Sequence, residues 1–449
     1  MHNVIYPTTN LAAVEQITIE RGEGVYVYDS QGRRYLEGLA GLWCTALGYG
    51  NKELIDAAAE QMGKLAYYHA FGGKTHPSIM ELADKLSGMV PVEDAKIFFG
   101  NSGSDANDTL LKIIRYHANA TGNPRRTKVI TRERAYHGVT VASGGLTSLP
   151  ANLTHFDPPM DALGILRTDH PHYYKGRLVG ESESAFVERI VGNLERLILD
   201  EGPDTIAAFL VEPITGASGV IVPPDGYYES VQAVLERYGV MLWADEVICG
   251  FGRTGSDFGC TTMDIHNPKM MTLAKQLSSA YVPISASVVS GDIYDALVTP
   301  SKEVGVFGHG YTYSGHPLGC AVALKTLEIY QRDAIFEKAA EVGRYFQTKL
   351  RALETHPLVG EVRGEGLIAA IELVADKSSA APFPASIATF FQSACADAGL
   401  IGRAVAGTAF ALCPPLIITF EQIDEMHHCL VLGLDATLEE VHRQGLTVA

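Results

Sequence analysis

The stretch that decides the fold is residues 96–107, which read KIFFGNSGSDAN. The apolar run Lys96–Phe99 is typical of a strand, and the residues after it open a helix with apolar positions at Leu110 and Ile113. Small residues at such a turn leave backbone N–H groups free, and the N-terminus of a helix is partly positive. The turn predicts either a phosphate site at Ser102–Ser104 or an ordinary helix cap, since Ser and Asp favour both.

Helical stretches and short apolar runs alternate outward from this turn, from about residue 52 to residue 320. Further strand-like runs are Lys128–Thr131, Ala207–Val211 and Val240–Ala244. This alternation predicts an α/β domain with a largely parallel sheet. In such sheets ligands bind beyond the carboxyl ends of the strands, where several polar motifs of this chain begin.

The pattern changes beyond about residue 325. One long helical pattern covers residues 321–353, a strand pair covers 359–363 and 367–373, and two more helices are expected near 385–398 and 422–441. Together with a hairpin predicted at residues 25–36, these elements indicate a smaller α+β domain. We therefore expect an N-terminal segment, 1–60, that contributes to the small domain, a large domain, 61–324, and a C-terminal small domain, 325–449.

The composition limits the class of protein. Of 449 residues, 47% are hydrophobic and 19% are charged, which suits a sizeable core. A net charge of −17 argues against nucleic acid or an anionic membrane as the main partner. Seven scattered cysteines, no signal peptide at Met1–Val4 and no membrane-length apolar run predict a soluble cytoplasmic protein with reduced thiols.

An acid and a lysine follow two of the predicted strands. Asp245 and Glu246 end the run Val240–Ala244, and a buried acid there needs a cation, such as a protonated pyridine nitrogen, unless the strand end is exposed. Lys275 comes thirty positions after Asp245, between an apolar run and Ser278. A single lysine usually lies on the surface, but beside a phosphate site and a buried acid it becomes a Schiff-base candidate.

Two other motifs carry less weight. Gly250–Gly255 fits the dinucleotide pattern G-x-G-x-x-G, but residues 256–267 lack the apolar period of the helix that this site requires. Asp169–Tyr173 contains residue types that bind metals. Pro171 between its two histidines, and the absence of a second cluster at suitable spacing, favour a loop.

Taken together and in this order, the motifs resemble the class III (subgroup II) aminotransferases of pyridoxal-phosphate fold type I, in the omega-amino acid and amine:pyruvate branch. The resemblance implies an aspartate aminotransferase-like large domain that binds pyridoxal 5'-phosphate. It also implies ping-pong transfer of an amino group from an omega-amino acid or amine to a keto acid, with pyruvate the expected acceptor. The segments that carry it are Asn101–Asn107, Tyr136–Gly138, Glu212-Pro213, Asp245–Gly255, Ala274-Lys275, His309–Pro317 and Arg363–Gly366.

The same resemblance implies the roles of single residues. Lys275 would bind the cofactor covalently and move the substrate proton, and Asp245 would keep the pyridine nitrogen protonated. Tyr136 and Val247 would cover the two faces of the ring. The expected cofactor-binding residues are Ser102, Gly103, Ser104, Tyr136, His137, Glu212, Asp245, Val247, Lys275 and Thr312. Of these, Thr312 would come from a second subunit, which predicts a homodimer or a larger assembly of dimers.

Substrate binding is assigned in the same way to three residues. Arg403 would bind a carboxylate, although a solvated arginine is the alternative, and Trp43 and Tyr136 would wall the amine side. Gly402 and the small residues 406–408 predict a flexible loop that would let Arg403 swing between pocket and solvent.

Other functions stay open at this point. A mutase, decarboxylase or epimerase would share the cofactor motifs, because these report the cofactor more than the reaction. Only the motif Gly250–Gly255 favours a nicotinamide-dependent oxidoreductase. A non-catalytic regulator on this fold would need a DNA-binding module, and the N-terminal segment is too short for one. The amine donor also stays open among taurine, β-alanine, a longer omega-amino acid and an arylalkylamine.

Overall fold

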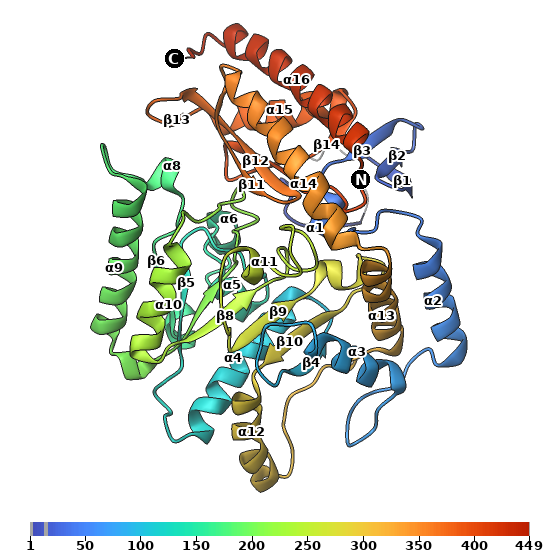
Figure 1. Cartoon of the computed structure of the whole chain (residues 1–449), viewed down its shortest axis with the longest axis vertical. Helices are drawn as coiled ribbons and strands as arrows, with labels where there is room; N and C mark the ends of the chain where they lie inside the picture. The colour runs from blue at the N-terminus through green and yellow to red at the C-terminus, as the bar shows by residue number, and fades with distance from the viewer. Residues whose placement is uncertain (1–2, 13–16, 449) are drawn as a thin grey trace.

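A seven-stranded sheet lies at the centre of the computed structural model, which describes residues 3–12 and 17–448 (Figure 1). In sheet order its strands are β4 (Lys96–Gly100), β10 (Ser285–Val289), β9 (Met270–Leu273), β8 (Met241–Asp245), β7 (Ile206–Val211), β5 (Lys128–Arg132) and β6 (Ile165–Thr168). Strands β9, β8, β7, β5 and β6 pair in parallel, and β10 runs antiparallel to both β4 and β9. The predicted α/β class with a largely parallel sheet is confirmed.

Helices cover both faces of this sheet, so its strands are buried on two sides. Leu110 of α4 packs in one cluster with Leu210 of β7, while the neighbouring Phe209 packs on the other face with Phe186 of α9. Successive strand residues point to opposite faces, which is why β7 is apolar throughout. The covering helices include α4 (Gly103–Ala120), α5 (Val141–Leu146), α9 (Glu183–Glu201), α10 (Tyr227–Tyr238), α12 (Gly291–Val304) and α13 (Pro317–Arg332).

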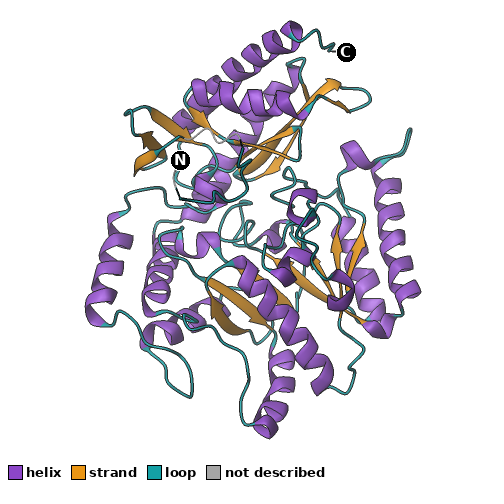
Figure 2. Cartoon of the chain, turned by 180° about the vertical axis from the view of Figure 1, so that it is seen from behind, coloured by secondary structure: helices purple, strands orange, loops and turns teal. Residues whose placement is uncertain are grey.

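Two smaller sheets and three helices form a second body, which combines N-terminal strands with the C-terminal part of the chain (Figure 2). One sheet contains β11 (Val359–Glu365), β12 (Ile368–Asp376), β16 (Ala409–Leu412) and β15 (Arg403–Val405), with β13 (Ala381–Pro382) beside β12. The other contains β1 (Ile19–Glu23), β2 (Tyr26–Asp29), β3 (Arg34–Glu37) and β14 (Leu400–Ile401). The helices are α14 (Ile335–Arg351), α15 (Ala385–Asp397) and α16 (Phe420–Arg443).

Residues far apart in the sequence meet in these sheets. The predicted hairpin is confirmed as the antiparallel pair β2–β3, and β14 adds to it in parallel, so Leu400 lies beside Leu36. The predicted strand pair is confirmed as β11–β12. The division at residues 60 and 324 stays a prediction: residue 60 lies inside α2 (Lys52–Lys64), and residues 1–2, 13–16 and 449 lie outside the described part.

The long helix predicted over residues 321–353 is wrong. The chain forms α13 and α14 instead, and Ala334 between them has a left-handed φ of 50°. The backbone N–H of Asp333 still bonds to Ile329, and the side chain of Arg332 reaches across to Glu53 of α2 at 2.7 Å. Apolar residues continue through the break, so periodicity alone did not reveal it.

The glycine-rich motif Gly250–Gly255 contacts the β11–β12 turn rather than opening a nucleotide site. The backbone N–H of Leu367 donates to the carbonyl of Arg253 at 3.0 Å, and the Arg253 guanidinium donates to the carbonyl of Leu367 at 2.9 Å. The next helix, α11 (Gly259–Thr262), is a single turn. The motif therefore fastens the second body to the central sheet.

The remaining α-helices of the described residues are α1 (Ala40–Trp43), α3 (Pro77–Ser87), α6 (Pro150–Leu153), α7 (Met160–Leu163) and α8 (Tyr173–Gly176). Residues 169–172 form the loop before α8, as the sequence predicted. Within residues 3–12 and 17–448, no helix is long and apolar enough to cross a membrane, and no cluster of metal-ligating side chains occurs. All seven cysteines are free.

Gly366→Ala should destabilise the fold, because Gly366 has φ 55° and an added Cβ would lie 2.4 Å from the carbonyl carbon of Thr254. Overpacking against backbone atoms and left-handed strain together should lower the free energy of unfolding by about 3 kcal/mol. Urea-induced unfolding followed by circular dichroism measures this. The control Gly122→Ala has a similar φ of 74° with open space around it; equal effects of the two substitutions would contradict the close approach.

Candidate active site

A cavity of about 430 Å³ lies beyond the carboxyl ends of β8 and β9, beside the N-terminus of α4. It brings together nine of the residues predicted to hold the cofactor: Ser102, Gly103, Ser104, Tyr136, His137, Glu212, Asp245, Val247 and Lys275. Thr312 does not line this cavity; it is exposed, and its carbonyl accepts a hydrogen bond from the Tyr67 hydroxyl at 2.8 Å. The sheet thus collects side chains that are separated by up to 173 positions in the sequence.

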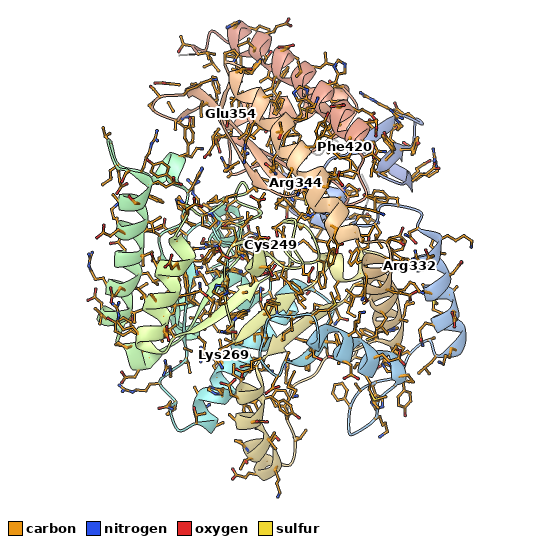
Figure 3. The ribbon with its side chains drawn as sticks, viewed as in Figure 1. Cys249, Lys269, Arg332, Arg344, Glu354 and Phe420 are labelled. Carbon is orange, nitrogen blue, oxygen red and sulfur yellow. The ribbon has the colours of Figure 1, made fainter. Side chains whose placement is uncertain are left out.

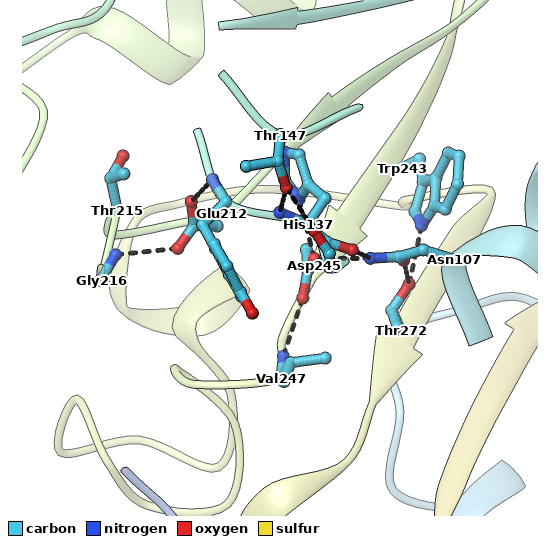
Figure 4. Close-up of polar contacts among 12 residues, drawn as sticks. Asn107, His137, Thr147, Glu212, Thr215, Gly216, Trp243, Asp245, Val247 and Thr272 are labelled. Carbon is cyan, nitrogen blue, oxygen red and sulfur yellow. Dashed lines mark hydrogen bonds and ion pairs between the residues drawn. The ribbon is translucent and has the colours of Figure 1, made fainter. Parts of the chain in front are cut away.

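Asp245 is buried at the end of β8, with 3% of its surface exposed (Figure 4). One carboxylate oxygen accepts from Nδ1 of His137 at 2.8 Å and from Nδ2 of Asn107 at 3.0 Å, and the other accepts from the Val247 N–H at 3.1 Å. Glu246 points elsewhere, to the backbone N–H groups of residues 259 and 260, and burial raises its pKa to about 7. Three hydrogen-bond donors therefore hold the Asp245 carboxylate at the cavity, whereas Glu246 points away from it.

Asn107 and Thr272 are site residues that sequence reasoning missed. The Thr272 hydroxyl donates to Oδ1 of Asn107 at 2.6 Å, and Nε1 of Trp243 donates to that hydroxyl at 2.9 Å (Figure 4). This chain of bonds orients the Asn107 amide toward Asp245. One signal in the sequence could have indicated Asn107. It lies one turn after Gly103 on α4, and residues four apart share a helix face.

Lys275 lies just after β9 in a left-handed backbone conformation, with φ 45°. Burial lowers the pKa of its amine, and the charge of Asp245 opposes this effect in part. Within the described residues, the amine makes no hydrogen bond or ion pair. A lowered pKa and the lack of a partner make an amine more nucleophilic, so this lysine is suited to react with an aldehyde.

Lys269, the nearest alternative, has a different environment. Its amine pairs with Asp292 at 3.0 Å, and it lies at the lower end of the sheet in Figure 3, away from Cys249 near the centre. It does not line the cavity that contains Lys275. The structure therefore brings Lys275, and not Lys269, to the acid and the helix N-terminus.

The N-terminus of α4 forms the other end of the cavity. Ser102 caps the helix by accepting from the Asp105 N–H at 3.1 Å, and the Asp105 carboxylate accepts from the Ser102 N–H at 3.1 Å. An added Cβ on Gly103 would lie 3.1 Å from Val247, so a glycine permits this close approach. N–H groups of the first turn have no helical acceptor and can bind an anion.

Glu212 acts on the backbone around the cavity. Its buried carboxylate accepts from the N–H of Tyr136 at 3.1 Å and from that of Gly216 at 2.8 Å, and burial raises its pKa (Figure 4). The half-buried Tyr136 ring lines the cavity and is held in place through its own backbone.

A second cavity, of about 940 Å³, shares Tyr136 and Lys275 with the first and extends to Trp43 and Arg403. Trp43 is 2% exposed and also packs in a hydrophobic cluster. Arg403 is the first residue of β15 and pairs with Ala411 of β16, so it lies in a strand and not in a loop. The small residues 406–408 form the turn after this strand, and the flexibility predicted for them stays a prediction. The strand pairing holds the backbone of Arg403, so any swing between pocket and solvent would have to come from its side chain.

These residues fit pyridoxal 5'-phosphate at three separate points. A buried carboxylate suits a protonated pyridine nitrogen, a helix N-terminus suits a phosphate, and an unpaired amine suits the aldehyde. With the parallel sheet, they define a pyridoxal-phosphate enzyme of fold type I.

The family follows from comparison with known proteins. The sequence model described as "Aminotransferase class-III" matches residues 9–433. The chain belongs to this family and is a pyridoxal-phosphate-dependent aminotransferase.

Individual relatives cover nearly all of the chain. It is 45% identical over 431 residues to gamma aminobutyrate transaminase 1, mitochondrial, of Solanum lycopersicum, which covers 95% of this chain and 83% of the relative. It is 44% identical over 446 residues to probable gamma-aminobutyrate transaminase 3, mitochondrial, of Oryza sativa subsp. indica, covering 98% and 87%. The omega transaminase of Pseudomonas jessenii, solved in complex with PMP, is 46% identical with a TM-score of 0.95, covering 98% and 97%.

Reductive trapping should identify the reactive lysine. Incubation with pyridoxal phosphate, then borohydride, should label Lys275, because burial favours its neutral amine. Peptide mapping reads the position, and Lys275→Ala should lose both the label and all turnover. Lys269→Ala is the control and should keep both; a label on Lys269 in the wild type would contradict the assignment.

Proposed function

We propose that the protein moves an amino group from an omega-amino acid or amine to a keto acid, with pyruvate as the acceptor. The observation that carries this proposal is the second cavity, where the Lys275 amine shares one space with the cationic Arg403 and the apolar Trp43. A carboxylate suits the arginine, and an apolar amine suits the tryptophan. The names of the relatives, gamma-aminobutyrate and omega transaminases, support the same donor class.

The proposed roles follow the contacts of each residue. When bound, pyridoxal phosphate supplies an electron sink for the bond electrons of the substrate. Lys275 would remove and return the proton at the substrate carbon, and Asp245 would pair with the ring nitrogen. The supporting residues would be Ser102, Gly103 and Ser104 at the phosphate, Tyr136 and Val247 on the ring faces, and His137 and Glu212 as orienting groups.

A homodimer, or a larger assembly of dimers, is part of the proposal. Thr312 is exposed, and so are three aromatic side chains around its segment: Tyr67 (39%), whose hydroxyl donates to the Thr312 carbonyl, the adjacent Tyr313 (57%), and Phe71 (47%), whose ring lies next to Gly310. Exposed apolar patches of this kind mark interaction sites, so this face would carry Thr312 to the phosphate site of a second subunit. The cytoplasm stays the proposed location. Only the sequence prediction supports it, because the plant relatives are named mitochondrial or chloroplastic.

A donor screen tests the function. Purified enzyme with pyridoxal phosphate and pyruvate should form alanine from at least one of β-alanine, 4-aminobutanoate, taurine or an arylalkylamine. Lys275→Ala is the matched control and should form none. If no donor yields alanine but the enzyme is active with another keto acid, pyruvate is not the acceptor. If the amine is decarboxylated, or its amino group migrates without transfer, the reaction is not transamination.

Arg403→Ala should separate the two half-reactions. A bidentate, charge-assisted pair is lost, so the KM for pyruvate should rise about 10- to 100-fold. The half-reaction of an uncharged arylalkylamine should change less than about twofold, because it uses no carboxylate. Single-turnover absorbance measures each half-reaction separately. Arg403→Lys keeps the charge but not the two-pronged guanidinium, so its KM for pyruvate should lie between those of the wild type and Arg403→Ala. Equal damage to both halves would make Arg403 structural.

A further inference from the structure

A buried network of charged side chains joins the second body to the large sheet domain, outside the cofactor cavity. At its centre, Glu372 of β12 is 1% exposed and accepts from the guanidinium of Arg363 at 2.9 Å and from the amine of Lys175 at 2.6 Å. The Arg363 guanidinium also pairs with Glu361 at 2.6 Å, and Glu361 accepts from His172 at 2.9 Å. The two cations, Lys175 and Arg363, therefore balance the charges of the two carboxylates, Glu361 and Glu372.

One end of this network contacts the hairpin that carries Arg403. The Lys175 amine donates to the hydroxyl of Thr408 at 2.8 Å, and that hydroxyl also donates to Glu372. Thr408 directly follows the turn residues Ala406 and Gly407, whose φ angles are 52° and 82°. Both turn residues line the second cavity together with Arg403, so Thr408 is the anchored end of a cavity wall.

The other end contacts a second loop that lines the same cavity. Nε of Arg363 donates to the carbonyl of Gly219 at 2.7 Å. Gly219 has φ 107°, and an added Cβ would lie 2.8 Å from the Arg363 guanidinium and 3.2 Å from Ala409. The residues just before it, Ala217 and Ser218, line the second cavity. A single set of ion pairs therefore sets the spacing between the loop at 217–219 and the Arg403 hairpin.

Stability is a weak reason for such a network. Removing two charges from water costs several kcal/mol each, and apolar replacements of buried ion pairs are often neutral for folding. The directional bonds of Lys175 and Arg363, in contrast, fix positions that apolar packing would leave adjustable.

We propose that Lys175, Glu372 and Arg363 are positioning residues for the acceptor half-reaction: they hold the turn at 406–408 against the large domain, so that Arg403 meets the keto-acid carboxylate. The inference rests on the proposed role of Arg403 in binding that carboxylate. Lys175 comes from α8 and the other two from β11 and β12, so the second body must sit in its observed place for the acceptor site to be complete.

The test uses the full-length holoenzyme with Lys175→Met, which keeps the length of the side chain and removes its charge and donors. The KM for pyruvate should rise about tenfold, while the single-turnover rate with an arylalkylamine stays within about twofold. Hydrogen exchange should quicken at the amides of residues 406–408. Lys175→Arg, which keeps charge and donors, should restore most of the pyruvate KM. Lys269→Met, which breaks the exposed pair with Asp292, is the matched control and should change none of these readouts.

Either of two results would overturn the inference. One is a Lys175→Met enzyme that matches Lys269→Met in pyruvate KM and in exchange at the turn. The other is an equal loss in both half-reactions, which would assign the network to folding in general. Should Lys175→Met fail to fold, Thr408→Val removes the same anchor without leaving a buried charge, and the same readouts apply. If Arg403→Ala is selective for pyruvate and these variants are not, the proposed function stands and the positioning role fails.

Discussion

The structure depends on how a carboxylate is kept buried at the end of a strand. Asp245 can remain at that depth only because His137, Asn107 and the Val247 N–H donate to it. These donors come from a loop after β5, from α4 and from the backbone beyond β8, so one acid requires three segments to converge. The same convergence places the N-terminus of α4 and the Lys275 amine at the ends of one cavity.

Under the proposed function, the two cavities would let one site serve two unlike substrates. Tyr136 and Lys275 line both cavities, so Lys275 lies at their junction, and Arg403 lines only the second cavity. A fixed cation would be left unpaired by an amine that has no carboxylate. Because β15 holds the backbone of Arg403, adaptation would have to come from rotation of its side chain. In the proposed mechanism, the placement of the hairpin would therefore affect binding of the acceptor.

Much of the fold could be predicted from local patterns. The runs that became β4, β5, β7 and β8 are largely apolar because helices cover both faces of the sheet, and Gly and small residues mark the turn that follows β4. The break between α13 and α14 could not be predicted, since the apolar period continues through Ala334 and the contact of Arg332 with Glu53 is remote in sequence. Small residues around Arg403 resembled a loop, although pairing with β16 makes it a strand.

By itself, the sequence determined the α/β class of the sheet and the family resemblance, and it singled out Lys275, Asp245 and the Ser102–Ser104 turn as candidate site residues, because these follow from short-range periodicity and from motifs in a set order. Only the tertiary structure decided that Asn107 and Thr272 support Asp245, that Glu246 points away, and that Lys175 reaches Glu372 across 197 positions. The physical reason is that hydrogen bonds and ion pairs depend on distances of about 3 Å between side chains, and such distances are set by packing of the whole chain rather than by neighbours along it.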